Sequence, residues 1–284
     1  MRREIGMMKM LTFTTIVDEV APWRPELRLF NFGEPLMHPG LGEMIRYAKL
    51  RGLAANFQTN GVLLDDNRSI ALLESGVTYV GVSVNGLTES EYESIRPGCR
   101  LDDIRENVRH LRETAARMGI SVHIHINAQI LADESNSRRG DMERYIRYWE
   151  GIPDTLSVSG ISLFDNIAVM KTGISSKISQ SSLPRKDQAN IVCTEPFDRL
   201  VIKWDGRITP CCADYDARLV LGQIGNRTLE EVWRGRTMAD LRRMIEQKKY
   251  DSSELCRSCP KLYSHEFTML FRKNINAQNE KIAK

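Results

Sequence analysis

Apolar and polar positions alternate along the first 165 residues as repeated strand and helix units require. Short apolar runs predict strands at 27–32, 54–59, 79–84, 122–129 and 156–163. Between them, apolar residues recur at helical spacing and predict helices over 40–50, 66–75, 101–118 and 142–149. Strands that alternate with helices in this way pair in parallel through crossover connections. The pattern therefore predicts an α/β fold.

The pattern changes after residue 165. Residues 172–190 are rich in serine and lysine and lack an apolar period, so we expect a linker there. A hairpin comes next, because RLVIKWDGRITPCC holds two short apolar runs joined by Asp205-Gly206. Thr228 and Glu231 then form a capping-box pattern, and a second helix is expected at 238–247. We expect a first domain at 1–170, a linker at 171–190, a small domain at 191–265 and a polar tail at 266–284.

Successive predicted strands end in polar turns that contain glycine. The first turn is FNFGEPLMHPG at 30–40, and the next two are QTNG at 58–61 and SVNG at 83–86. In parallel α/β folds, the loops after the carboxyl ends of the strands build the binding site. Ordinary turn chemistry accounts for each motif alone. Their recurrence favours a shared ligand-binding rim.

The predicted strand VHIHINAQI has one polar side. A period of two places His123, His125 and Asn127 together and the apolar residues opposite. In a partial barrel this polar side would face the lumen, beside a ligand. The alternative is that the histidines are satisfied structural groups, which we favour for His123. Asn127 lies nearer the carboxyl end of the strand and stays a binding candidate.

Composition and charge exclude several classes of function. The chain has 284 residues, of which 42% are hydrophobic and 27% charged, as in an ordinary globular protein. Its net charge of +3 comes without a basic patch, so we expect no nucleic-acid binding. No apolar run approaches the roughly 18 residues of a membrane-spanning helix, and MRREIGMMKM lacks the apolar core of a signal peptide. We expect a cytoplasmic protein without a membrane partner.

The six cysteines stand at 99, 193, 211, 212, 256 and 259. They are too few for a disulfide scaffold in a chain of this length, and a reducing compartment would keep them as thiols. Cys256 and Cys259 share one tight turn, and Cys193 and Cys211 flank the predicted hairpin, an arrangement that suits a tetrahedral metal or an iron-sulfur cluster. Zinc ribbons usually bring two close pairs of cysteines, so the spacing favours a cluster over zinc. Inert buried thiols are a third interpretation.

The other cysteines are expected to play no part in that site. Cys212 directly follows Cys211, and adjacent residues of a strand point to opposite faces, so only one of them can face a shared ligand. We expect Cys211 to be the ligand. Cys99 comes after Arg96-Pro97-Gly98 and is expected to be an ordinary thiol.

These motifs, taken in order, resemble the radical S-adenosylmethionine (SAM) family with a C-terminal SPASM or twitch domain. NFGEPLMHP resembles that family's GGEP-type motif, and TNGVLL and VSVNGLTESEYESIRPG come after it in the expected order. The C-terminal part resembles the family through CTEPFDRLVIKWDGRITPCC, LGQIGNRTLEEVW and LCRSCP. The resemblance covers residues 5–263. It implies a partial (β/α) TIM-like barrel and a small iron-sulfur domain with a β-hairpin and helices.

The resemblance also implies where SAM would bind. Gly33, Glu34 and Pro35 would present backbone groups to its methionine amino group, and Ser83 would contact its ribose or carboxylate. The full set of candidate cofactor-binding residues is Gly33, Glu34, Pro35, Thr59, Asn60, Ser83 and Asn127.

In the second domain the cysteine pattern resembles the one-cluster twitch form, most closely that of the aminocyclitol (2-deoxy-scyllo-inosamine) dehydrogenase. By this resemblance one auxiliary 4Fe-4S cluster would be held by Cys193, Cys211, Cys256 and Cys259. Full SPASM domains carry more cysteines, and where one of these would fall the chain has His265.

The sequence departs from the family at the catalytic cluster. The family holds that cluster with C-x3-C-x2-C after the first barrel strand, and this chain has no cysteine before Cys99. REIGMMKM and LTFTTIVDEV resemble the segment that comes shortly after that motif, so we expect the first strand to be missing and residues 27–32 to form an open edge strand. Either the full protein begins earlier and holds a second, catalytic 4Fe-4S cluster, or the chain is a shortened paralogue. We favour the first explanation and assign no catalytic residue.

The family resemblance implies an oxidoreductase or maturase that uses SAM and an auxiliary cluster. Its substrate would be a small metabolite, a sugar alcohol or a peptide, and its reductant a protein such as flavodoxin or ferredoxin. The alternatives are a non-catalytic iron-sulfur paralogue, acting as a scaffold or in electron transfer, and a zinc-stabilised binding module.

Overall fold

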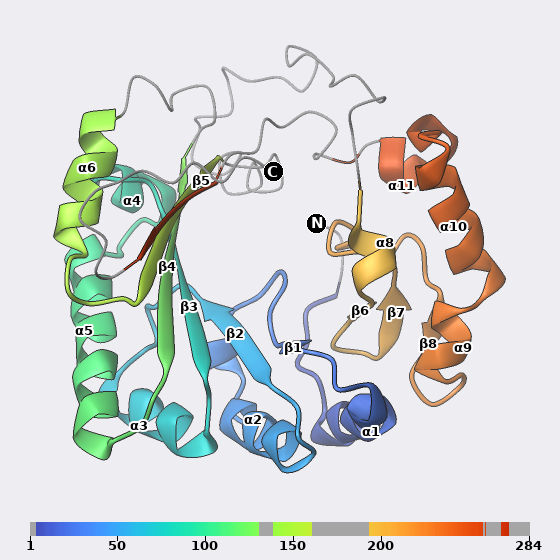
Figure 1. Ribbon diagram of the computed structural model, residues 1–284, viewed down its shortest axis with the longest axis horizontal. Coiled ribbons are helices and arrows are strands. Elements are labelled where there is room, and N and C mark those ends of the chain that lie inside the picture. The colour runs from blue at the N-terminus through green and yellow to red at the C-terminus, as the bar shows by residue number, and fades with distance from the viewer. Residues whose placement is uncertain (1–3, 131–138, 161–192, 258, 260–267, 273–284) are drawn as a thin grey trace. The chain divides into compact units, whose positions relative to one another are not determined.

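The computed structural model describes residues 4–130, 139–160, 193–257, 259 and 268–272 (Figure 1). The chain forms two compact units, each built from separate stretches of sequence. One unit joins Met1–Pro25, Leu50–Leu53 and Ser181–Tyr263, and the other joins Glu26–Lys49, Ala54–Gln180 and Ser264–Lys284. The domain boundary expected at residue 170 stays a prediction, and the expected linker at 171–190 lies outside the described residues.

A six-stranded sheet in the order β1-β2-β3-β4-β5-β9 forms the centre of the larger unit. The parallel strands are β1 (Leu27–Arg28), β2 (Ala55–Thr59), β3 (Tyr79–Asn85), β4 (His123–Ile130) and β5 (Thr155–Gly160). The sheet is open, and β1 pairs only with β2 in the described part of the chain. These findings confirm the expected α/β class with an incomplete barrel.

Two strands differ from the sequence-based expectation. β1 covers two residues, where the pattern predicts a strand over 27–32, because among the described residues it has a neighbour on one side only. β9 (Thr268–Arg272) lies in the expected polar tail and pairs antiparallel with β5. The sequence pattern did not indicate this return to the sheet.

Apolar side chains of the central strands point to one face of the sheet. Val80, Val82, Ile124 and Ile126 are fully buried, and in β4 the buried residues alternate with the more exposed His123, His125 and Asn127. The helices of this unit are α2 (Leu41–Leu50), α3 (Asp66–Ser75), α4 (Glu89–Ile95), α5 (Leu101–Met118) and α6 (Arg139–Tyr148). Figure 1 shows α5 and α6 on the same side of the sheet. The other face carries polar side chains, as predicted for β4.

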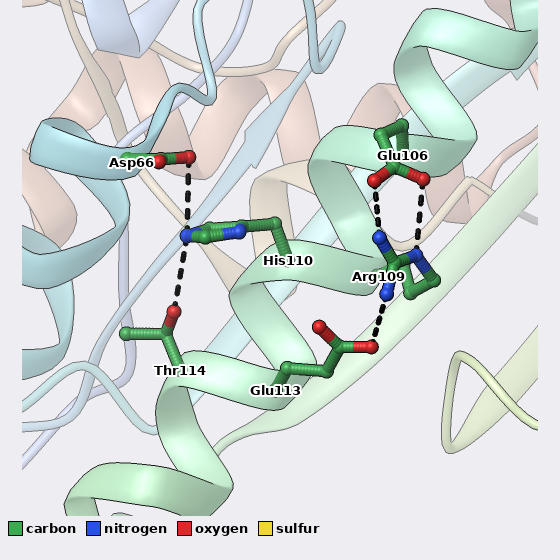
Figure 2. Close-up of polar contacts among 6 residues, drawn as sticks. All are labelled: Asp66, Glu106, Arg109, His110, Glu113 and Thr114. Carbon is green, nitrogen blue, oxygen red and sulfur yellow. Dashed lines mark hydrogen bonds and ion pairs between the residues drawn. The ribbon is translucent and has the colours of Figure 1, made fainter.

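Polar groups of α5 contact one another, and one of them contacts α3 (Figure 2). Arg109 forms ion pairs with Glu106 and Glu113, and its hydrogen bonds lower the pKa of Glu106. His110 Nε2 lies 3.0 Å from Asp66 Oδ1 at the start of α3 and 3.2 Å from Thr114 Oγ1. Exposed ion pairs of this kind add little to stability, so we assign the network a local structural role.

A partly buried ion pair fixes α5 to the start of β5. The carboxylate of Asp154 accepts a hydrogen bond from the Ile124 backbone N–H at 2.8 Å and pairs with Arg112. Arg112 also donates from Nε to the carbonyl oxygen of Ile152 at 3.1 Å. Burial raises the pKa of Asp154, but these hydrogen bonds outweigh burial and hold the pKa below its usual 3.8.

We expect Asp154 to make stability depend on pH. Because its pKa is lower in the folded than in the unfolded chain, its contribution is complete at neutral pH and is lost on acidification below about pH 4. Urea unfolding from pH 6 to pH 3 should show a smaller loss of unfolding free energy for Asp154→Asn than for wild type. Equal losses for wild type and Asp154→Asn would contradict the prediction.

The smaller unit contains a three-stranded antiparallel sheet in the order β6-β7-β8. Its elements are α1 (Met10–Val20), α8 (Glu195–Asp198), β6 (Val201–Ile202), β7 (Arg207–Thr209), β8 (Gly222–Gln223), α9 (Leu229–Trp233), α10 (Arg236–Glu246) and α11 (Glu254–Arg257). The predicted hairpin is confirmed, with Gly206 at φ +86 in its turn. The predicted capping box is confirmed too, since Thr228 and Glu231 make both of its hydrogen bonds at the start of α9.

Two apolar clusters hold the smaller unit together. Ile16 of α1 packs with Ile208 and with Leu229 and Val232 of α9, so the N-terminal helix belongs to this unit. Burial of side chains of this size contributes on the order of 1.5–3 kcal/mol each. In the second cluster, Met238, Leu241, Ile245 and Tyr250 pack against Cys193, Cys256 and Cys259. The cysteines thus lie against an apolar core built on α10.

Among the described residues, no helix is both long enough and apolar enough to cross a bilayer.

Candidate functional site

Glu34 connects the loop after β1 to the end of β2. Its Oε1 accepts hydrogen bonds from Thr59 Oγ1 at 2.7 Å and from the Leu36 backbone N–H at 3.0 Å. Its Oε2 accepts from the Asn60 backbone N–H at 2.8 Å. A carboxylate that accepts several hydrogen bonds holds its donors firmly in place. The structure therefore brings the GEP and TNG motifs together at the carboxyl ends of neighbouring strands.

These contacts separate the candidate residues that support the loop from those that could contact a ligand. Gly33 precedes the bracing carboxylate, and Pro35 begins the short 3-10 helix Pro35–Met37. Thr59 is 2% exposed, and its hydroxyl binds Glu34 and the Gly61 backbone N–H. Thr59 thus supports the loop and does not face outward. Gly33, Pro35 and Asn60 remain candidates for contact with a ligand.

The turn after β2 requires a glycine. Gly61 adopts φ +79, and a Cβ there would lie 2.8 Å from Ile104 Cγ2. Asn107 of α5 donates from Nδ2 to the Gly61 carbonyl oxygen at 3.0 Å. Sequence reasoning missed Asn107, because a single polar residue on a helix carries no signal of its long-range partner.

Ser83 and Asn127 lie side by side on the polar face of the sheet. Ser83 of β3 pairs in register with Asn127 of β4, which pairs with Ser157 of β5. Asn127 donates from Nδ2 to Ser157 Oγ at 2.9 Å. Sequence reasoning missed Thr155 and Ser157, although their alternation with apolar residues in DTLSV was a usable signal.

The two histidines of β4 are hydrogen-bonded to β5. His123 Nε2 lies 2.9 Å from Thr155 Oγ1, and the Tyr79 ring stacks on the His123 ring with centroids 5.5 Å apart. His125 lies with Nδ1 2.7 Å from Thr155 Oγ1 and Nε2 3.0 Å from Ser157 Oγ. Burial, with a smaller effect of His123, lowers the pKa of His125 to about 4, so His125 is neutral at pH 7. His123 has the partners expected of a structural group.

Five cysteines of the smaller unit line one hollow. They are Cys193, Cys211, Cys212, Cys256 and Cys259, and the wall between them includes Leu241, Ile245 and Leu255. The Cys259 backbone N–H donates to the Cys256 carbonyl oxygen at 3.0 Å, which forms the tight turn expected from the sequence. Burial raises the pKa of the Cys211 and Cys256 thiols, and the neighbouring Cys212 raises that of Cys211 further.

The thiol set fits an iron-sulfur cluster in its chemistry. Thiolates from separate segments hold such clusters, each on its own iron, in a pocket that limits access of water. In the described residues, no three histidine, cysteine or acidic side chains converge closely enough to hold one metal ion. The thiols line a hollow, and four of them would supply one thiolate to each iron of a 4Fe-4S cluster.

We expected only one of Cys211 and Cys212 at the site because adjacent residues of an extended strand point to opposite faces. In the structure the two cysteines do not lie on a strand. β7 ends at Thr209, and both cysteines lie in the turn after it. Both thiols therefore line the same hollow. The choice of Cys211 as ligand stays a prediction. Cys99 closes a turn in the larger unit, and His265 lies outside the described residues.

Comparison with known proteins finds two matching segments of the chain. Residues 9–133 match the Radical SAM superfamily, and residues 193–260 match SPASM, an iron-sulfur cluster-binding domain. The chain is 28% identical over 234 residues to the tungsten-containing aldehyde ferredoxin oxidoreductase cofactor-modifying protein of Pyrococcus furiosus, covering 73% of this chain and 64% of that protein. It is 27% identical over 78 residues to the S-adenosyl-L-methionine-dependent 2-deoxy-scyllo-inosamine dehydrogenase of Niallia circulans, covering 28% of this chain and 31% of that enzyme.

A solved structure supports the fold. BtrN in complex with AdoMet and 2-DOIA has a TM-score of 0.57 at 18% identity, covering 91% of this chain and 82% of BtrN. The chain spans less than two thirds of the length of the curated relatives named above. The two matched domains imply SAM and 4Fe-4S clusters as cofactors. We therefore identify residues 9–133 as a radical SAM domain and residues 193–260 as a SPASM domain, as the order of the motifs predicts.

Proposed function

We propose that this chain is the SAM-binding and auxiliary-cluster part of a radical SAM/SPASM oxidoreductase or maturase. One observation carries the proposal: thiols from three separate segments of the SPASM domain line a single hollow. The ligands of an auxiliary cluster in this hollow would be Cys193, Cys211, Cys256 and Cys259. A cluster bound there would supply one-electron transfer or a site for substrate.

The residues of the radical SAM domain would bind and orient SAM. Glu34 holds the loop after β1 in place through Thr59 and the Asn60 backbone. With the loop fixed, the backbone of Gly33 would be available to the amino group of SAM, and the Pro35 carbonyl oxygen would accept from it in addition to the His38 N–H. Ser83 and Asn127 would offer hydrogen bonds from the neighbouring strands.

The radical-forming step needs a second cluster. The family binds that cluster with C-x3-C-x2-C, and the 284 residues contain no such motif. For these 284 residues we therefore propose SAM binding and one auxiliary cluster. The substrate would be a small metabolite, a sugar alcohol or a peptide, and the electron donor a flavodoxin or ferredoxin in the cytoplasm.

Anaerobic reconstitution with iron and sulfide tests this proposal. We expect about four irons per chain, the visible absorption of an iron-sulfur cluster, and SAM binding by calorimetry. With dithionite and SAM, the chain as it stands should yield no 5'-deoxyadenosine. Binding of zinc in place of iron, or failure to bind SAM, would contradict the proposal.

A non-catalytic iron-sulfur protein is the second candidate, because the thiol-lined hollow would hold a cluster whether or not the chain binds SAM. It would bind the auxiliary cluster and serve as a scaffold or electron carrier. The two candidates differ in SAM binding. A chain that reconstitutes with iron but gives no heat with SAM would support the second.

A further inference from the structure

A continuous row of hydrogen bonds runs along the polar face of β4 and β5. It links His123 to Thr155, Thr155 to His125, His125 to Ser157 and Ser157 to Asn127, at 2.9, 2.7, 3.0 and 2.9 Å. Each link crosses between the two strands, so the row climbs the sheet from one end of β4 toward its carboxyl end. At that end Asn127 lies beside Ser83.

The chemistry of the groups gives the row a direction. Asn127 Nδ2 can only donate, so Ser157 Oγ accepts there and has one hydrogen left to donate. That hydrogen goes to His125 Nε2, which therefore accepts. A neutral imidazole has one donor and one acceptor nitrogen, so His125 carries its proton on Nδ1 and donates to Thr155 Oγ1. Thr155 donates in turn to His123 Nε2.

The surroundings keep this row intact. Ser157 is 3% exposed, and the Tyr79 ring stacks on His125 with centroids 6.2 Å apart and the rings inclined by 23°. The Ser157 hydroxyl is therefore shielded from water, whereas His125 and Thr155 are partly buried. A buried hydroxyl between one donor and one acceptor keeps one orientation, because rotating its hydrogen away from the acceptor would leave a buried polar group without a hydrogen bond.

We propose that His125 is a positioning residue that acts through Ser157 to fix the amide of Asn127 at the ligand-binding end of the sheet. With Ser157 oriented by His125, the Asn127 amide has its Nδ2 directed toward β5, and the amide can turn over only if the proton of His125 moves to the other ring nitrogen. The Asn127 side chain then keeps one fixed orientation beside Ser83, with its Oδ1 buried. That the ligand recognised there is SAM rests on the proposed function, whereas the direction of the row does not.

Replacing the amide with a carboxylate reverses the row. In Asn127→Asp the new group only accepts, so Ser157 must give its hydrogen to it. Ser157 Oγ can then only accept from His125, whose proton moves from Nδ1 to Nε2. The side chain changes by one group, and the tautomer of a histidine two residues away changes with it.

Nitrogen-15 NMR of histidine-labelled full-length chain measures this directly. We expect the Nδ1–H tautomer of His125 in wild type and the Nε2–H tautomer in Asn127→Asp, both at pH 8. Ser83→Ala is the matched control, because Ser83 neighbours Asn127 but is not in the row, and it should leave the tautomer unchanged. An Nε2–H tautomer in wild type, or an unchanged tautomer in Asn127→Asp, would overturn the proposal.

Ser157→Ala provides a second measurement that does not depend on the folding of Asn127→Asp. It removes the link between His125 and Asn127, so the side-chain amide protons of Asn127 should exchange with water at least about tenfold faster. SAM affinity should fall by about tenfold in the same variant. Unchanged amide exchange would overturn the positioning role. If wild type binds no SAM, the proposed function fails, and the NMR result still decides the role of His125.

Discussion

Cys256→Ala is expected to abolish the iron-sulfur cluster of the reconstituted chain. Cys256 lies on α11 and lines the hollow with thiols from two other segments, so its loss leaves one iron without a protein ligand. A methyl group cannot replace a thiolate, and incomplete ligation exposes the cluster to loss of iron. Iron should fall from about four per chain to below about one, and the visible absorption should disappear.

Matched cysteine variants make this result specific. Cys99→Ala changes a thiol in the other unit and should keep full iron content. Cys211→Ala and Cys212→Ala remove neighbouring thiols of one turn, and we expect only the first to lose the cluster. Loss in Cys212→Ala with retention in Cys211→Ala would show that our choice of ligand is wrong. Full iron content in Cys256→Ala would refute the site itself.

Glu34→Ala is expected to have the largest effect in the radical SAM domain. The substitution leaves three donors without their acceptor: the Leu36 and Asn60 backbone N–H groups and the Thr59 hydroxyl. Because Glu34 is only partly buried, water compensates some of this loss, and we expect the free energy of unfolding to fall by about 2 kcal/mol. SAM affinity should fall at least about tenfold, since the loop loses its fixed position. Urea unfolding and calorimetry measure the two effects.

Two further variants test the cause. Glu34→Gln keeps one acceptor oxygen but replaces the other with an NH₂ group, which faces hydrogen-bond donors. Its losses of unfolding free energy and of SAM affinity should therefore lie between those of wild type and Glu34→Ala. Glu43→Ala removes an exposed carboxylate from α2 and should change the unfolding free energy by less than about 0.5 kcal/mol. If Glu34→Ala matched Glu43→Ala in both measurements, Glu34 would not hold the loop.

Much of the fold was predictable because local patterns and tertiary packing agree. The predicted bounds 66–75 and 101–118 are those of α3 and α5. Asp65 and Gly76 cap the two ends of α3, and Gly119 caps the end of α5. The period-two pattern of VHIHINAQI correctly predicted which face of β4 is buried. The Asp205-Gly206 turn and the capping box of α9 are local and were likewise predictable. Such features depend on residues a few positions apart.

The unpredicted features depend on partners far apart in the sequence. No local pattern shows that Asn107 will bind the Gly61 carbonyl oxygen, or that Ser157 will lie beside Asn127. β7 ends at Thr209, and Pro210 directly after it was an overlooked signal for the turn that brings Cys212 to the hollow. The sequence predicted that the backbone of Glu34 would bind SAM, and only the structure shows the contacts of its carboxylate.

The position of β9 in the sequence bears on how the protein folds as it is made. β5 ends at Gly160, and its antiparallel neighbour begins at Thr268, after the residues that match the SPASM domain. During synthesis the edge of β5 therefore waits for its last partner while about a hundred residues emerge from the ribosome, at about 5–20 residues per second. An unpaired strand edge in this interval is open to pairing with other nascent chains. Because β9 pairs with β5 late, the chain would be most prone to aggregate while β5 is made but not yet paired with β9.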